Sequence, residues 1–123
     1  MIELTTRELS RAIRVYRRGD IIISAKLSQD MGLEDGDHIQ IFMQREQGFP
    51  EMFIAKGDTG TIVKKRKNDR SMRLFCKRVT DKLLQGEEKG VFRIGEKIEK
   101  EGIELHSIIY KRNYAGRKEV HQV

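Results

Sequence analysis

The amino-acid sequence predicts a mainly β domain of the α+β class, a small β-barrel with two short helices built from two ββαβ-like halves. Three observations predict this fold. Short β-prone runs alternate along most of the chain with turns that contain glycine and aspartate. Two short segments place apolar residues at helical spacing. The two halves of the chain also align with each other at an offset of 52 residues.

Chain length favours one domain, because 123 residues are enough for a single core and too few for two ordinary domains. Near the N-terminus, Thr5-Thr6-Arg7-Glu8 is a capping-box pattern, and a helix beginning there would extend to about Ile13. An extended arm is the alternative for this segment. The expected organisation is a single domain over 1–123, with pseudo-repeat halves at about 13–56 and 61–112, an N-terminal arm or short helix at 1–12, and a polar tail at 113–123.

The first half is expected to open with a β-hairpin. Ile13–Tyr16 and Ile21–Ile23 are β-prone runs, and they flank the turn signal Arg17-Arg18-Gly19-Asp20. A glycine–aspartate pair between two apolar runs is typical of a tight hairpin connection.

A short helix and two strands are expected to complete this half. Ser24–Met31 is predicted to be helical, because Leu27 and Met31 lie on one helical face and Gly32 suits a C-cap. The remaining expected elements are a turn at Leu33–Asp37, an alternating strand at His38–Met43, a loop at 44–50 and a strand at Met52–Ala55.

The second half is expected to repeat this order. Its elements are a strand at Thr61–Val63 that continues into a basic run, a turn at Lys67–Arg70, a strand at Met72–Cys76, a short helix at Arg78–Leu84, a strand at Val91–Ile94, an extended polar excursion with a turn at 95–102, and a last strand at Glu104–Tyr110. In the alignment Ile22 falls on Leu74 and Ser24 on Cys76, and the match resumes after a one-residue insertion. This pattern predicts a duplication, while chance similarity between two β-rich halves is the alternative.

The stretch from about residue 13 to 42 resembles the AbrB/SpoVT family of bacterial transition-state regulators. It contains a hairpin with glycine, an apolar strand, a helix, the turn Gly32-Leu33-Glu34-Asp35-Gly36-Asp37 and an alternating strand. Gly36-Asp37 is similar to the Gly-Asp box of cradle-loop barrels, since glycine can take a positive φ and aspartate can accept hydrogen bonds from backbone N–H groups. Two departures stand out: Ala25 replaces the proline usual before the family's helix, and the second half has no clear Gly-Asp box.

The resemblance implies a cradle-loop-type barrel, either in the two-unit arrangement of MraZ-like proteins or as a monomeric double-psi barrel. It also implies that a basic surface on a β-rich dimer binds DNA. The same barrels serve elsewhere as scaffolds and enzyme domains, so the fold alone does not fix the function.

Positive charge is concentrated in the middle of the chain. The protein carries 25 Lys and Arg against 19 Asp and Glu, a net charge of +6, and residues 61–82 hold nine of the basic side chains with only two acidic ones. In a strand, Lys64 and Arg66 would lie on one face, and Lys65 and Lys67 on the other. The predicted nucleic-acid-binding residues are Arg14, Arg17, Arg18, Lys64, Lys65, Arg66, Lys67, Arg70, Arg73, Lys77 and Arg78.

These observations predict a non-enzymatic nucleic-acid-binding protein, a transcriptional regulator of AbrB-like type whose basic β-hairpins contact DNA phosphates. The expected partners are DNA and a second copy in a homodimer. The alternative is a β-barrel module that binds other proteins, with the basic run serving only as a solvated strand edge.

The sequence predicts no enzyme, no cofactor, no metal site and no membrane span. His38, His106 and His121 are far apart in the chain, with only Cys76 to join them, and their spacing does not suit zinc. No phosphate-binding glycine loop occurs. No stretch approaches the ~18–20 apolar residues of a membrane helix. A single cysteine cannot form an internal disulfide, which suits a reducing compartment and predicts a cytoplasmic protein.

Overall fold

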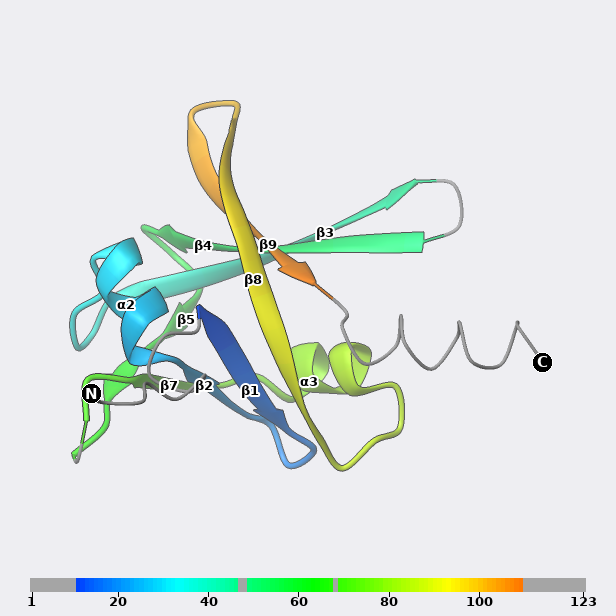
Figure 1. Ribbon diagram of the computed structural model, residues 1–123, viewed down its shortest axis with the longest axis horizontal. Coiled ribbons are helices and arrows are strands. Elements are labelled where there is room, and N and C mark those ends of the chain that lie inside the picture. Colours follow the sequence, from blue (N-terminus) through cyan, green and yellow to red (C-terminus); the bar gives the residue numbers. More distant parts are fainter. Residues whose placement is uncertain (1–10, 47–48, 68, 110–123) are drawn as a thin grey trace, which may run out of the picture.

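One antiparallel sheet of nine strands, rolled into a nearly closed barrel, dominates the structure (Figure 1). The computed structural model describes residues 11–46, 49–67 and 69–109. Its elements are β1 (Ala12–Tyr16), β2 (Asp20–Ile23), α2 (Ala25–Met31), β3 (His38–Glu46), β4 (Phe49–Gly57), β5 (Thr61–Ile62), β6 (Lys64–Lys65), β7 (Met72–Phe75), α3 (Lys77–Leu84), β8 (Lys89–Lys100) and β9 (Ile103–Ile109). The mainly β barrel with short helices that the sequence predicts is therefore confirmed.

The sheet closes on itself through one short segment. Its strand order is β5-β3-β4-β9-β8-β1-β2-β7-β6, so β5 lies at one end and β6 at the other. Yet β5 and β6 are separated in sequence only by Val63, which is fully buried. The two ends of the sheet are therefore parts of a single stretch of chain, and that stretch closes the barrel.

The turn between α2 and β3 holds this closing segment in place. The Gly36 N–H donates to the Val63 carbonyl at 2.9 Å, and the Val63 N–H donates to the Asp37 carbonyl at 2.8 Å. Gly36 has a φ of +94°, as expected for this turn. The Asp37 carboxylate accepts a 2.7 Å hydrogen bond from the Glu34 N–H, which lowers the pKa of Asp37; nearby Lys56 lowers it further.

The barrel interior is filled by alternate residues of the central strands. Ile13, Val15, Ile21, Ile23 and Ile54 are fully buried. The helices add Leu27 from α2, and Leu83 and Leu84 from α3, to the same apolar cluster. Since side chains alternate between the two faces of a strand, the residues between these positions lie on the outer face of the barrel.

The two halves of the chain share one order of elements: hairpin, helix, hairpin. Ser24 and Cys76, aligned at the offset of 52 residues, occupy the N-cap positions of α2 and α3. Within the strands this offset is wrong: Ile22 lies on the outer face opposite Arg73, whereas Leu74, on which it falls, belongs to the core. The pairings also correspond, with β1–β2 matching β6–β7 and β3–β4 matching β8–β9. A shared evolutionary origin of the halves stays a prediction.

One hairpin is longer than the sequence predicts. Residues 44–50 do not form the expected loop, because β3 runs to Glu46 and β4 begins at Phe49. The extended polar excursion with a turn at 95–102 is confirmed, since β8 continues to Lys100 and a turn precedes β9. Both hairpins project beyond the barrel (Figure 1), and Glu96–Lys100 of β8 are exposed.

Only part of what the sequence predicts for the two ends of the chain can be compared with the structure. β1 begins at Ala12, so a helix that extends to Ile13 is wrong. The capping-box segment and the polar tail at 113–123 lie outside the described residues.

We expect Val63→Ala to lower the free energy of unfolding by about 2 kcal/mol, because it removes two buried methyl groups and leaves a cavity at the barrel closure. Urea unfolding followed by circular dichroism measures the change. The matched control is Ile62→Ala on the adjacent, half-exposed side chain, which should stay within about 0.5 kcal/mol of the unmodified protein. Equal losses for the two variants would contradict the role given to Val63.

Candidate nucleic-acid interface

Three of the predicted basic residues form a line across the outer face of the barrel. Arg14 on β1 is paired with Ile22 on β2, Ile22 with Arg73 on β7, and Arg73 with Lys64 on β6. Directly paired residues on neighbouring strands point to the same side of a sheet, so Arg14, Arg73 and Lys64 share one face. Arg73 and Lys64 are exposed and Arg14 is half-buried.

Strand β8 extends this line with residues that the sequence analysis missed. Val91 is paired with Arg14, and on either side of it Lys89 and Arg93 are exposed on the same face. The partnership of β8 with β1 joins segments about 75 residues apart, so no local pattern could have indicated it. We call the surface formed by Arg14, Lys64, Arg73, Lys89 and Arg93 the basic face.

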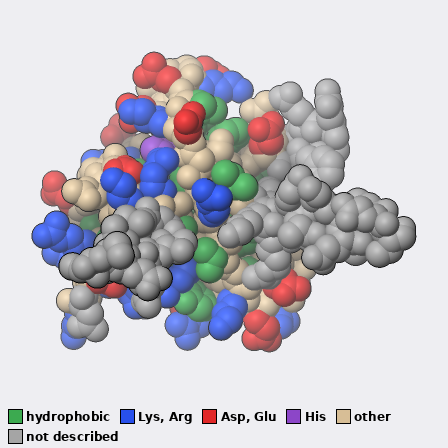
Figure 2. All heavy atoms as spheres, viewed as in Figure 1, with side chains coloured by type: hydrophobic (Ala, Val, Ile, Leu, Met, Phe, Trp, Pro, Cys, Tyr) green, Lys and Arg blue, Asp and Glu red, His purple; other side chains and the backbone are tan. Residues whose placement is uncertain are grey.

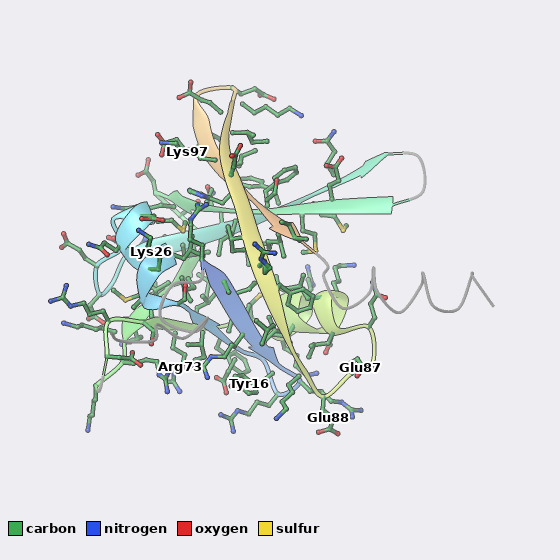
Figure 3. The ribbon with its side chains drawn as sticks, in the orientation of Figure 1. Tyr16, Lys26, Arg73, Glu87, Glu88 and Lys97 are labelled. Atoms are coloured by element: carbon green, nitrogen blue, oxygen red, sulfur yellow. The ribbon has the colours of Figure 1, made fainter. Side chains whose placement is uncertain are left out.

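Figure 3 shows where one residue of this surface lies. Arg73 and Tyr16 lie below the barrel, while Lys97 lies near its opposite end. In Figure 2, Lys and Arg side chains occur along the same lower edge, together with Asp and Glu and some hydrophobic side chains.

The turn between β1 and β2 brings two more predicted residues close to acidic partners. Arg17 and Arg18 are both exposed. The Arg17 guanidinium lies 3.4 Å from the Glu88 carboxylate, and the Arg18 Nε donates to the nearly buried Asp20 carboxylate. These ion pairs neutralise part of the charge that this turn offers to a polyanion.

The loop between β6 and β7 carries Arg66, Lys67 and Arg70. Arg66 contacts the Ser71 hydroxyl at 3.4 Å and lies 4.0 Å from the Asp69 carboxylate. Hydrogen bonds from the Ser71 hydroxyl and N–H hold the pKa of Asp69 below its usual value, and the charges of Arg66 and Arg14 act in the same direction. Part of the positive charge of this loop is therefore balanced by Asp69.

Three predicted residues lie apart from the line. Lys65 is paired with buried Met72, opposite in direction to Lys64, and its backbone N–H donates to the Asp35 carboxylate at 2.7 Å. Lys77 and Arg78 are exposed on the first turn of α3, where Lys77 forms a 2.7 Å ion pair with Asp81. The alternation expected for Lys64 and Lys65 is observed, and it removes Lys65 from the basic face.

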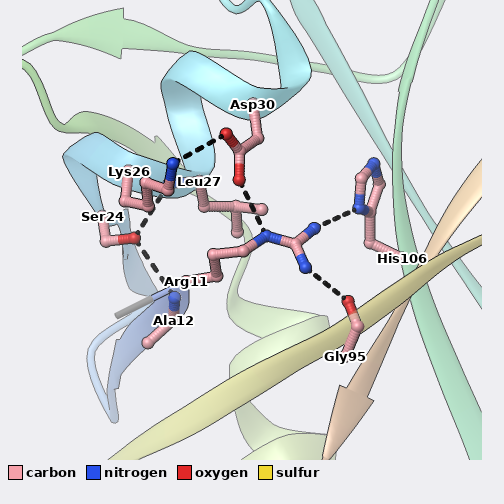
Figure 4. Close-up of polar contacts among 8 residues, drawn as sticks. All are labelled: Arg11, Ala12, Ser24, Lys26, Leu27, Asp30, Gly95 and His106. Carbon is pink, nitrogen blue, oxygen red and sulfur yellow. Dashed lines mark hydrogen bonds and ion pairs between the residues drawn. The ribbon is translucent and has the colours of Figure 1, made fainter. Parts of the chain in front are cut away.

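A half-buried arginine just before β1 links three elements elsewhere in the barrel (Figure 4). Arg11 Nε lies 2.9 Å from the Asp30 carboxylate of α2, and Nη1 donates to the Gly95 carbonyl of β8 at 2.9 Å. Arg11 Nη2 lies 2.9 Å from Nδ1 of His106 on β9. Because a guanidinium can only donate, Nδ1 must accept, which requires the neutral imidazole. Burial lowers the pKa of His106, and the charge of Arg11 lowers it further.

His106 also borders a cleft of about 570 Å³, lined among others by Lys56, Asp58, Thr59 and Glu104. The amine of Lys56 in this cleft already donates a hydrogen bond to the Gly32 carbonyl, at 3.0 Å. The cleft mixes both signs of charge, and Asp58 and Thr59 lie in a bend. It offers less specific chemistry than the basic face.

The structure shows neither a membrane-spanning helix nor a metal-binding cluster in the parts that it describes. Across residues 11–46, 49–67 and 69–109, each helix is too short to cross a bilayer. Within those same ranges, no group of three or more His, Cys, Asp or Glu side chains is placed to hold a metal ion. Comparison with protein-family models, with curated proteins and with solved structures produced no match for this chain.

We expect the stability of the protein to fall as the pH drops below about 6.5, the ordinary pKa of histidine. The folded pKa of His106 is lower than its unfolded pKa, so the unfolded chain binds more protons in that window; the contribution is fully present above it. Urea unfolding between pH 7.5 and 5 measures this slope. His106→Asn, which keeps an acceptor near the Nδ1 position without titrating, should flatten it.

The control for this prediction is His38→Asn, on a half-buried strand residue, which should keep the slope. An unchanged slope in His106→Asn would contradict the assignment of the acid sensitivity to the Arg11–His106 contact.

Proposed function

We propose that this protein binds DNA without catalysis, through the phosphate contacts that its basic face can make. The observation that carries the proposal is the line of Arg14, Arg73 and Lys64 across three strands. Neighbouring strands lie about 4.8 Å apart, so Lys64 and Arg73 are about one strand apart, and Arg73 and Arg14 about two. Cations at this spacing suit a polyanion better than a single small anion.

Charge and position support the same proposal. The strands that carry the basic face belong to one hydrogen-bonded sheet, so binding orders the exposed Lys and Arg side chains but does not have to order the backbone beneath them. The adjoining loops add Arg66, Lys67 and Arg70, and the β1–β2 turn adds Arg17 and Arg18. A regulator of AbrB-like type, acting as a homodimer, is the finer form of the proposal that the resemblance implies.

A second candidate is a protein-interaction module. Its support is a set of apolar side chains exposed on the projecting hairpins, among them Met43, Ile98 and Ile103. Failure of the protein to bind single-stranded or duplex DNA at low salt would favour this candidate. Its protein partners would then be sought by cross-linking.

We expect the protein to bind fluorescein-labelled DNA with an affinity that falls steeply with salt, because each neutralised phosphate releases counterions. The triple variant Arg14→Gln, Lys64→Gln, Arg73→Gln should bind weakly at every salt concentration. Its plot of log affinity against log salt should be shallower by about two to three units, close to one for each lost contact. Glutamine keeps much of each apolar stem, which protects the fold.

The matched control is Lys26→Gln, Lys97→Gln, Lys100→Gln, which removes the same charge from other exposed positions. It should keep most of the salt slope. If the two triple variants lost DNA affinity and salt slope equally, net charge alone would explain the effect. The basic face would then be rejected as the binding surface.

A further inference from the structure

Two aromatic side chains lie beside the basic line on the same outer face. Tyr16 follows Arg14 by two residues on β1, and Phe75 follows Arg73 by two residues on β7, so each points the same way as its arginine. Tyr16 is paired with Lys89, and Phe75 with Asp20. The outer face thus carries a basic line and, about 7 Å along the strands, a line that contains both aromatic rings.

The Phe75 ring is exposed, and a glycine beneath it makes room for it. The residue is 60% exposed, although a phenylalanine gains more from burial than almost any other residue. Its ring lies against Gly19, where an added Cβ would stand only 2.5 Å from Phe75 Cε1. Any side chain at position 19 would therefore displace the ring.

Hydrogen bonds fix the backbone under this ring. The Gly19 N–H donates to the Tyr16 carbonyl at 2.9 Å, and the Cys76 N–H donates to the Gly19 carbonyl at 2.9 Å. The ring therefore rests on an ordered turn, while much of its surface remains open to solvent. A rigid, exposed aromatic ring loses little conformational entropy when a ligand stacks on it.

The combination of rings and cations distinguishes between forms of nucleic acid. A duplex presents phosphates outside and keeps its bases stacked inside, so a surface ring has no base to contact. A single strand presents unstacked bases beside its phosphates, and proteins bind it with aromatic platforms along basic grooves. Both parts of such a platform occur here within one small area of sheet.

We propose that the basic face binds single-stranded nucleic acid, with phosphates on Arg14, Arg73 and Lys64 and a base stacked on Phe75. Tyr16 supplies a second stacking position. This inference rests on the proposed function and specifies the form of its ligand.

The test compares a single-stranded oligothymidine with a duplex of equal length, both labelled with fluorescein, at low salt. The single strand should bind more tightly. Phe75→Ala should weaken single-strand binding by about tenfold, the order expected for loss of one stacked base. Because it removes no charge, it should leave the salt slope unchanged, unlike the triple variant of the basic face.

Val91→Ala is the matched control, since Val91 is an exposed apolar residue on the same face without a π-system. It should bind the single strand nearly as well as the unmodified protein. Thermal unfolding of all variants checks that each is folded.

A second variant reports stacking directly. The chain contains no tryptophan, so Phe75→Trp introduces a single tryptophan, excited selectively over the three tyrosines, at the proposed site. Its emission should be quenched to saturation by the single-stranded oligothymidine and remain nearly constant with the duplex, because only a stacked base contacts the indole.

The outcomes separate the two proposals. Salt-dependent duplex binding that equals single-strand binding, with no effect of Phe75→Ala, would overturn the single-strand inference and leave DNA binding standing. Absence of binding to both forms at low salt would overturn both.

Discussion

The barrel depends on the hydrogen bonds that join the turn before β3 to Val63. A nine-stranded sheet with two free ends would leave unpaired backbone groups on β5 and β6. Here both ends belong to one stretch of chain, and the Gly36 and Asp37 backbone fixes that stretch at its midpoint. The buried Val63 side chain adds apolar contact at the same place. Closure of the sheet thus follows from one local turn.

The position of the basic face follows from this closure. Arg14 comes from the first half of the chain, and Arg73 and Lys64 come from the second. They lie in line because β2 pairs with β7, and because β6, which is part of the closing segment, pairs with the other side of β7. The candidate surface is therefore a product of the assembled barrel, and neither half carries it alone. The same closure keeps Tyr16 and Phe75 on one face.

Local pattern was sufficient to predict much of the fold. Alternation and turn residues placed β1, β2 and β7, and the Leu27–Met31 spacing with Gly32 placed α2. The β3–β4 hairpin is longer than predicted, because Gln44-Arg45-Glu46 is a polar run without the alternation that indicates a strand. For the site, the sequence shows which residues are basic. Which of them share the outer face of the barrel depends on the register in which the strands pair. Phe75 could have been found from its two-residue spacing to Arg73, whereas Lys89 and Arg93 required the long-range pairing of β8 with β1.

The way the two halves interlock has a consequence for how the protein folds. β1 pairs with β8, β2 with β7, and β4 with β9, so the strands of the first half pair with strands that are synthesised much later. Contacts of such high sequence separation slow folding and leave strand edges open in the meantime. A ribosome synthesises the chain from its N-terminus, and the edge of β1 stays unprotected until β8 has emerged. The barrel is therefore completed only after β9 has emerged, and until then the β1–β2 hairpin keeps an open strand edge.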